Sequence, residues 1–191
     1  MSAVTGPQSI TVDDYLQGEL QTDIKHEYLD GQVVAMGDAS RSHGLLAGEL
    51  YAVLKPHARR KGCQLFIADM KVRVQYDSGT YFYYPDLVAS CDPADREPYF
   101  RSSPCLIVEV LSPTTERIDT REKLLAYRLL PSLREYLLLR QDRMQADLYQ
   151  LGADGRWQHR QISDGRFVLN CLNAELVLAD VYVDLDLSAA A

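Results

Sequence analysis

The sequence lacks any long apolar run, and its N-terminus lacks the features of a secretory leader. A membrane span needs about 20 consecutive apolar residues, and a signal peptide needs a basic start followed by an apolar stretch. Residues 1–6 read Met-Ser-Ala-Val-Thr-Gly and offer neither. We therefore expect no membrane span, no signal peptide and no membrane partner, and we place the protein in the cytoplasm.

An excess of basic residues is also missing. Lys and Arg number 20 against 27 Asp and Glu, so the net charge is 20 − 27 = −7. Nonspecific affinity for nucleic acid comes largely from neutralising phosphates with Lys and Arg. The balance excludes a general polyanion binder, and any nucleic-acid contact must be local. The basic residues at 57–61 could make such a contact, but at a helix end they also complement the helix dipole.

No C-x-x-C pair occurs among the four cysteines, which lie at positions 63, 91, 105 and 171. This spacing is not that of a local metal motif. Two of the cysteines lie in apolar, strand-like runs. We therefore predict buried free thiols in a reducing compartment.

Length and patterning predict one domain of mixed α/β (α+β) class over residues 1–191, with a lead-in over about 1–24 and a β extension over about 145–187. The chain is 47% apolar and 25% charged, which is ordinary for a globular protein. The order of the elements favours a sandwich around a mixed sheet. Helices are predicted at residues 11–16 with Thr11 as cap, at 43–61 ending at Gly62, and at 119–130. Two strand pairs are predicted around turns, 25–29 with 32–36 around Asp30-Gly31 and 71–75 with 81–88 around residues 77–79. Further strands are predicted at 64–67, 105–111, 135–139, 145–151 and 157–162, and a loop at 92–103.

The run from Cys105 to Leu111, between Pro104 and Pro113, predicts a strand buried on both faces. Strand parity places Glu109 on the same face as Ile107 and Leu111. A lone buried carboxylate costs several kcal/mol, on the order of an unpaired buried charge, unless a cation or donors meet it. Glu109 therefore needs a partner, unless the strand ends there and the carboxylate reaches water or an arginine.

Three groups could together perform chemistry: Asp86 after a proline, Glu109 on the next strand, and Lys123 in the following helix. Two carboxylates at neighbouring strand ends can hold a hard cation such as Mg²⁺, with Mn²⁺ as a substitute. A lysine beside them could orient or activate a water. This combination is suited to hydrolysing a phosphodiester.

The motifs around these residues resemble those of the Uma2 (Uma-two) family of restriction-endonuclease-like proteins, over roughly residues 11–178. The family belongs to the PD-(D/E)XK nuclease superfamily, which implies a central mixed β-sheet flanked by helices, here with additional β-hairpins. The segments that carry the resemblance are Pro85-Asp86, Glu109-Val110-Leu111-Ser112-Pro113-Thr114-Thr115, Asp119 to Lys123, Tyr127, Leu133-Arg134-Glu135-Tyr136, His26 to Gly31, His43 and Val72-Arg73-Val74.

The resemblance implies Asp86 and Glu109 as metal ligands, with the Val110 backbone carbonyl as a further one. The lysine that the signature expects two residues after Glu109 is Leu111 here. Lys123 is the natural replacement, because this lysine can migrate to the following helix in the superfamily. The alternative for Lys123 is a solvent-facing pair with Asp119 across one turn.

Glu27 is a candidate third acidic group at the metal, with a cross-strand pair to Lys25 or an arginine as its alternative. His43 and Asp119 are predicted mainly as helix-start and helix-cap residues, although His43 could take part in catalysis.

Two further features are interpreted as structural. Asp69-Met70-Lys71 spells D-x-K but precedes Asp86, which is the wrong order for the signature. The tyrosines at 81–84 are typical of sheet packing, with base stacking as the alternative.

Taken together, the sequence predicts a Mg²⁺-dependent nuclease acting on nucleic acid, with DNA favoured, as a homodimer. The alternative is a catalytically inactive module of the same fold that binds a protein partner or structured nucleic acid.

Overall fold

The structure, a computed structural model, describes residues 9–77, 79–112 and 116–187. Ser78 of the predicted turn, Pro113 to Thr115 of the motif, and residues 1–8 of the lead-in lie outside these ranges. In chain order the elements are α1 (Val12–Glu19), β1 (His26–Leu29), β2 (Gln32–Ala35), α2 (Arg41–Lys61), β3 (Gln64–Ile67), β4 (Lys71–Tyr76), β5 (Gly79–Tyr83), β6 (Leu87–Ser90), β7 (Phe100–Arg101), β8 (Leu106–Leu111), the π-helix η1 (Ile118–Lys123), α3 (Leu124–Tyr127), β9 (Glu135–Arg140), β10 (Ala146–Leu151), β11 (Trp157–Ile162), β12 (Arg166–Leu169), β13 (Ala174–Val177) and α4 (Leu178–Val181).

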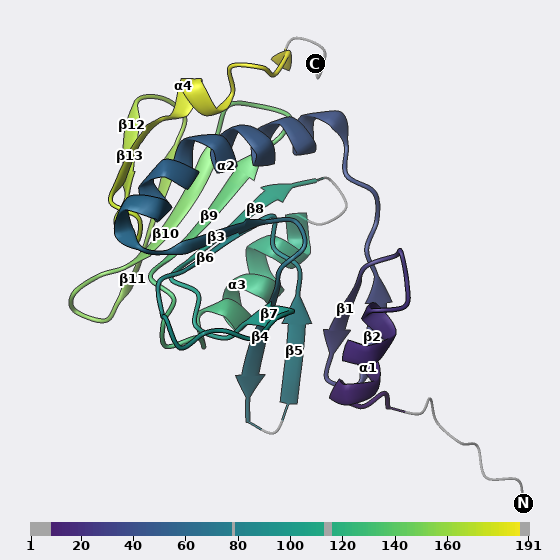
Figure 1. The fold of residues 1–191 in the computed structure, drawn as a ribbon. Coiled ribbons are helices and arrows are strands. Elements are labelled where there is room, and N and C mark those ends of the chain that lie inside the picture. The colour runs from purple at the N-terminus through teal and green to yellow at the C-terminus, as the bar shows by residue number, and fades with distance from the viewer. Residues whose placement is uncertain (1–8, 78, 113–115, 188–191) are drawn as a thin grey trace, which may run out of the picture.

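A six-stranded mixed sheet forms the centre, in the order β11-β10-β9-β8-β6-β3 (Figure 1). Strands β8 and β9 run parallel, and β6 runs antiparallel to β8. All six residues of β8 are buried, as its apolar composition predicts. The predicted fold, a central mixed sheet flanked by helices, is confirmed.

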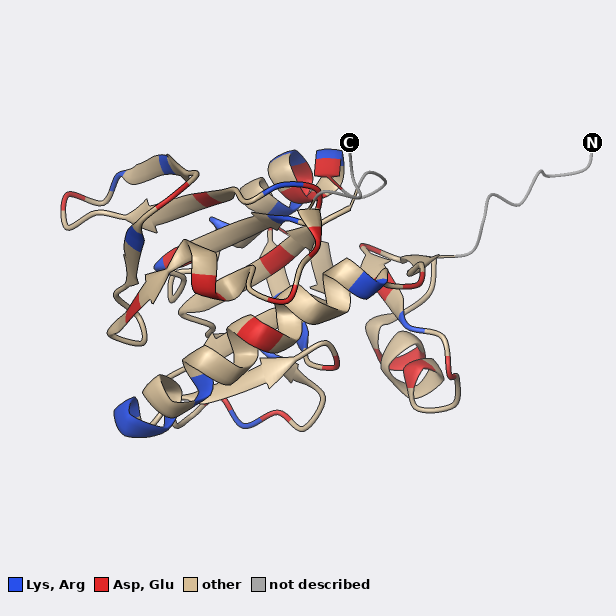
Figure 2. Cartoon of the chain, turned by 90° about the horizontal axis from the view of Figure 1, so that it is seen from above, with Lys and Arg blue, Asp and Glu red and all other residues tan. Residues whose placement is uncertain are grey.

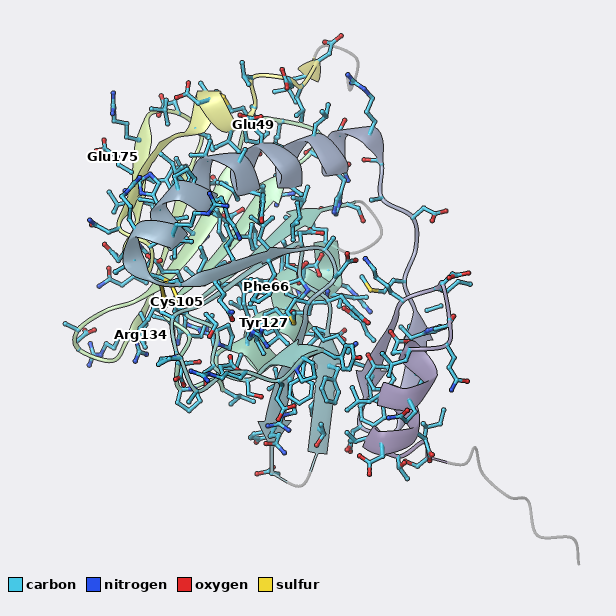
Figure 3. All side chains as sticks on the ribbon, viewed as in Figure 1. Glu49, Phe66, Cys105, Tyr127, Arg134 and Glu175 are labelled. Carbon is cyan, nitrogen blue, oxygen red and sulfur yellow. A yellow bond between two sulfur atoms is a disulfide. The ribbon has the colours of Figure 1, made fainter. Side chains whose placement is uncertain are left out.

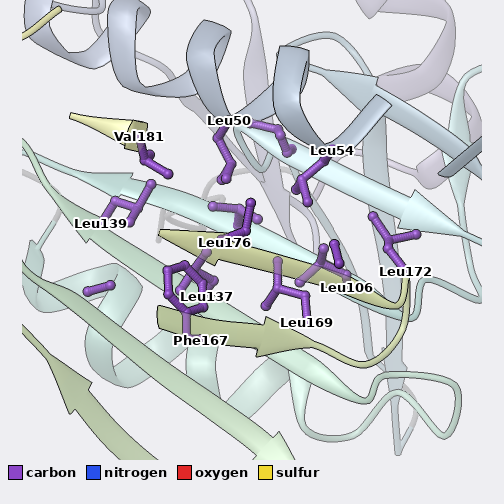
Figure 4. Close-up of a cluster of buried hydrophobic side chains, with 14 of the residues drawn as sticks. Leu50, Leu54, Leu106, Leu137, Leu139, Phe167, Leu169, Leu172, Leu176 and Val181 are labelled. Atoms are coloured by element: carbon purple, nitrogen blue, oxygen red, sulfur yellow. The ribbon is translucent and has the colours of Figure 1, made fainter. Parts of the chain in front are cut away.

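Helices cover both faces of this sheet. Helix α2 packs Leu46, Leu50 and Leu54 on one face, against side chains that include Leu106 and Leu137 (Figure 4). The other face, which carries Ile107 and Leu111, packs against α3 and β4. Because successive strand residues point to opposite faces, β8 contributes Leu106, Val108 and Val110 to the first core and Ile107 and Leu111 to the second.

A second, five-stranded sheet has the order β2-β1-β5-β4-β7. Helix α1 packs on it through Tyr15, whose ring lies 5.0 Å from that of Tyr28 and 5.4 Å from that of Phe82. Thr11 caps α1 as predicted, accepting a hydrogen bond from the amide of Asp14. The short strand β7 lies inside the segment predicted as a loop and pairs in parallel with β4.

Two predicted boundaries need correction. The strand expected over residues 81–88 is divided between β5, which ends at Tyr83, and β6, which begins at Leu87 in the six-stranded sheet. The helix expected over residues 119–130 is instead η1 followed by α3, which ends at Tyr127. Among the described residues, no helix combines the length and apolarity that crossing a membrane requires.

Helix α2 ends as its sequence predicts, at Gly62 in the left-handed region with φ 70°. We expect Gly62→Ala to lower the free energy of unfolding by about 1 kcal/mol, because only glycine adopts this conformation without strain. Gly48→Ala, inside the same helix, should raise it by about 0.5–1 kcal/mol. Neither added methyl group meets an atom within 4 Å. Thermal or urea unfolding of the two variants measures the change in the free energy of unfolding. Changes of the same sign and size at both positions would contradict this prediction.

The prediction of free thiols is wrong for this structure. Cys63 is joined to Cys91, and Cys105 to Cys171. The partners are 28 and 66 residues apart along the chain, so spacing alone gave no sign of the pairing.

Candidate active site

Asp86 directly precedes β6 and is held from two sides. The backbone amide of Val110 on β8 donates to its Oδ2 at 2.6 Å. His43, in the first turn of α2, contacts its Oδ1 through Nε2 at 2.7 Å. The Asp86 carboxylate is thus fixed between β8 and α2, and its side chain remains 17% exposed.

Glu109 lies on β8 and is almost fully buried, at 4% exposure. Its Oε1 accepts a hydrogen bond from the hydroxyl of Tyr127 at 3.2 Å and lies 3.3 Å from Nζ of Lys123. Tyr127 itself is buried beneath the six-stranded sheet (Figure 3). The strand continues to Leu111, so the alternative in which Glu109 ends the strand and reaches water is wrong.

Lys123 connects three carboxylates that come from distant parts of the chain. Besides Glu109, its Nζ lies 2.9 Å from Oε1 of Glu27 and 3.2 Å from Oδ1 of Asp119. Its side chain is only 6% exposed. Lys123 therefore pairs with Asp119 as the alternative interpretation supposed, but inside the protein and together with two other carboxylates.

We call the group formed by Glu27, Asp86, Glu109, Asp119 and Lys123 the acidic cluster. The sequence did not predict that Asp119 belongs to it. Asp119 is not a helix cap: it lies within η1, with its carboxylate buried and turned towards Lys123. Asp119, Lys123 and Tyr127 follow one another at four-residue spacing, and this signal could have placed all three on one face. π-Helical turns occur frequently at functional sites.

Burial and neighbouring charges shift the pKa values of the cluster. Burial raises the pKa of Glu109 well above its ordinary value; Lys123 opposes this rise, while Asp119, Asp86 and Glu27 add to it. Burial alone would lower the pKa of Lys123, but Glu109, Glu27 and Asp119 together raise it well above its ordinary value. Lys123 therefore stays protonated. The hydrogen bond with Asp86 raises the pKa of His43, against the effect of burial.

The cluster carries more negative charge than its own cation neutralises. Three of the four carboxylates share one lysine, whereas Asp86 is met by His43 and the amide of Val110. The ligands are all oxygens, which suits a hard divalent cation such as Mg²⁺. Within the described ranges, no three of these carboxylates bring oxygens within 4.8 Å of one another. The residues thus fit a Mg²⁺ ion held by one or two carboxylates and water, rather than a closed cage of protein ligands.

Other candidates lie elsewhere. Asp69 is exposed and pairs with Lys25 at 2.6 Å, so the D-x-K tripeptide does not join the cluster. The partner of Glu27 is Lys123 rather than Lys25. Tyr83 packs against Tyr127 in the core, in agreement with the structural interpretation of the tyrosine strand. Metal binding by the Val110 carbonyl stays a prediction.

Comparison with known proteins relates the chain to one family. The model of the family Uma2, described as "Putative restriction endonuclease", matches residues 12–181. Two uncharacterised proteins of Synechocystis are similar: slr1290, 36% identical over 78% of this chain and 77% of its own length, and sll1609, 31% identical over 82% and 89%.

A solved structure shares the fold. It is that of a "putative nuclease belonging to DUF820" from Anabaena variabilis, with a TM-score of 0.72 over 91% of this chain and 98% of its own, at 15% identity. The family match covers the segments that build the acidic cluster, from β1 through α3. The chain belongs to the Uma2 family of restriction-endonuclease-like proteins.

Proposed function

We propose that the protein is a metal-dependent nuclease that hydrolyses phosphodiester bonds in DNA. The observation that carries this proposal is the burial of Glu109 with Glu27 and Asp119 around the single lysine Lys123, within the electrostatic influence of Asp86. Such an arrangement is costly for stability, and it is typical of a site that receives a cation. Membership of a family described as "Putative restriction endonuclease" supports the same conclusion.

Asp86 and Glu109 would hold Mg²⁺ at the partly exposed side of the cluster. The ion would supply a water of lowered pKa and neutralise charge on a phosphoryl oxygen. Val110 and His43 hold the two oxygens of Asp86 in place through one hydrogen bond each. Each oxygen keeps a further lone pair for the cation.

Lys123 acts as a donor in this proposal. Because its pKa is raised, it carries a proton throughout the neutral range and orients the attacking water or stabilises developing negative charge. It does not serve as the general base. Tyr127, which is fully buried, donates a hydrogen bond to Glu109 from the interior side of the cluster.

Exposed basic groups lie close to the cluster in the sequence. Arg117 and Arg121 flank Asp119, and Arg41 begins the helix that carries His43. Figure 2 shows basic and acidic residues interspersed along the chain, with a basic end on α2. Phosphate contacts from a few such arginines suit local rather than general binding of nucleic acid, in accord with the net charge.

The proposal is tested by incubating the protein with plasmid, linear duplex, single-stranded and branched DNA, and RNA, in Mg²⁺ or Mn²⁺ and in EDTA. We expect cleavage of at least one DNA substrate with metal and none in EDTA. Asp86→Asn should lower the rate by about 10²- to 10³-fold, because it weakens several kcal/mol of transition-state stabilisation by the ion. Asp69→Asn, the same change at an exposed aspartate, should leave the rate unchanged.

A second function is favoured by one observation. Lys123 already contacts three of the four carboxylates, as it would in a module that keeps the fold but binds a protein or structured nucleic acid without cutting it. Absence of cleavage from folded protein on every substrate would support this module and refute the nuclease. Cleavage of RNA alone would refute the DNA substrate. The homodimer stays a prediction, which the mass of the protein in solution tests.

A further inference from the structure

All four cysteines of the chain meet at one place. They come from four separate segments: Cys63 follows α2, Cys91 follows β6, Cys105 precedes β8, and Cys171 lies in the turn between β12 and β13. The Sγ atoms of Cys91 and Cys105, which belong to different disulfides, are 3.4 Å apart. Those of Cys91, Cys105 and Cys171 all lie within 4.8 Å of one another, and Cys63 is bonded to Cys91. We call this group the sulfur cluster.

The sulfur cluster and the acidic cluster lie at opposite ends of the same strands. Asp86 precedes β6 and Cys91 follows it, whereas Cys105 precedes the antiparallel strand β8 and Glu109 lies near the end of that strand. Figure 3 shows Cys105 and Arg134 together at this other end. The sulfur cluster is therefore a separate site, and its chemistry does not depend on the proposed nuclease function.

Two disulfides do not require four sulfurs to converge. Each disulfide is complete by itself, and nothing in its chemistry brings it to 3.4 Å from another. Four thiolates around one Zn²⁺ do require convergence: with Zn–S bonds of about 2.3 Å, tetrahedral geometry places the sulfurs about 3.8 Å apart. The distance between Cys91 and Cys105, and the grouping of three sulfurs within 4.8 Å, are close to this arrangement.

The backbone around Cys171 is held in place without its sulfur. The buried carboxylate of Glu135, on β9, accepts hydrogen bonds from the amides of Asn170 at 2.7 Å and Cys171 at 3.0 Å. On the other side, Nζ of Lys61 donates to the carbonyls of the same two residues at 3.0 and 2.8 Å. We therefore expect the turn to stay beside the other three cysteines after reduction, and Lys61, which contacts the Cys171 carbonyl, adds a positive charge that favours thiolates.

We propose that the protein, once its disulfides are reduced, binds one Zn²⁺ through the thiolates of Cys63, Cys91, Cys105 and Cys171. Two equivalents of a dithiol reduce the two protein disulfides to four thiols and become two disulfides themselves. Zn²⁺ then displaces four protons and forms four Zn–S bonds. With four protein ligands the site is closed, as in structural zinc sites, and it ties α2, β6, β8 and the β12–β13 turn together.

The experiment reduces the purified protein with a dithiol under anaerobic conditions, removes the reductant, and titrates it with Zn²⁺ against a chromophoric chelator. We expect one tightly bound Zn²⁺ per chain and the release of up to four protons. Co²⁺ in place of Zn²⁺ should give the charge-transfer absorption of a tetrahedral tetrathiolate site, which reports the number of sulfur ligands in the unmutated protein. This readout needs no variant to fold.

Variants then identify the ligands. Cys105→Ser and Cys91→Ser should each lower the Zn²⁺ affinity by more than about 100-fold, since even loss of a neighbour that orients a metal ligand costs about 10- to 100-fold. Glu109→Gln, at the acidic cluster, should leave Zn²⁺ binding unchanged. A reduced protein that binds no Zn²⁺, a Co²⁺ spectrum without thiolate absorption, or binding that survives both cysteine changes would each overturn the proposal.

Discussion

Replacing Lys123 with methionine is expected to lower the free energy of unfolding by about 3–5 kcal/mol, because removing one partner of a buried ion cluster leaves the others uncompensated. Methionine keeps most of the volume of the side chain but removes its charge. Glu27, Glu109 and Asp119 would then face one another inside the protein with no cation between them. Cleavage should also fall, by about 10²-fold or more, because the protonated amine no longer stabilises developing charge.

Lys25→Met supplies the matched control. Lys25 pairs with Asp69 at 2.6 Å, closer than any contact of Lys123, but the two side chains are 40% and 83% exposed. Exposed pairs contribute only about 0–1 kcal/mol, so this change should cost no more than that. Urea unfolding of both variants measures the contrast. If Lys123→Met lowers the free energy of unfolding by no more than Lys25→Met does, burial of the acidic cluster does not make Lys123 important for stability.

Replacing Glu109 with glutamine is expected to abolish metal-dependent cleavage and, at neutral pH, to raise the free energy of unfolding. Glutamine keeps the shape and can still accept hydrogen bonds from Lys123 and Tyr127, but it removes one of four negative charges. The loss of cleavage should reach about 10²- to 10³-fold or more, since a metal ligand is lost. Cleavage should thus fall while the free energy of unfolding rises, as expected where active-site residues lower the stability of the folded protein.

The pH dependence of stability gives a second measurement of Glu109. Its pKa in the folded protein lies well above the unfolded value, so the folded state binds the proton more tightly. The stability that comes from the protonated form is complete below the ordinary pKa of 4.5 and is lost as pH rises through the raised pKa of the folded protein. In EDTA, the free energy of unfolding of the unmutated protein should therefore fall relative to that of Glu109→Gln across this window, by up to about 1.4 kcal/mol per pH unit.

Added Mg²⁺ should reverse the trend in the unmutated protein, because a ligand that binds only the folded state stabilises it. In Glu109→Gln the ion should have little effect. Asp69→Asn, which removes a charge outside the cluster, should keep the pH dependence and the Mg²⁺ response of the unmutated protein. Parallel pH curves for the unmutated protein and Glu109→Gln would show that the pKa of Glu109 is not raised by folding.

The parts of the fold that could be predicted are those whose signal is local. Strand β8 is encoded in a short apolar run between two prolines, and α2 in its apolar spacing and the glycine at its end. Strand β7 was missed because two residues carry too little pattern, although Phe100 is buried. The π-helix was missed because Asp119 looks like a cap in the sequence, whereas its carboxylate is turned to Lys123.

The candidate site could be predicted only in part, for the same reason. Asp86, Glu109 and Lys123 were recognised from motifs, and the structure brings Glu109 and Lys123 into contact. Asp119 joins the acidic cluster only because η1 turns its carboxylate towards Lys123. The hydrogen bond between His43 and Asp86 likewise depends on how α2 crosses the sheet. The meeting of four cysteines depends on the whole sheet, since no two of them are close in the sequence.

The position of Glu109 also has a consequence for the chain while it is being synthesised. Strand β8 is made before β9, its parallel neighbour, so Leu106–Leu111 emerges with one edge unpaired. Short runs of β-branched and aliphatic residues with a free edge are the segments that most readily join to other chains. Until Lys123 has been added and the core closes, Glu109 is a hydrated negative charge in the middle of that run. We therefore expect the carboxylate that lowers the stability of the folded protein to lower the tendency of the unfinished chain to aggregate, and a neutral residue at this position to remove both effects.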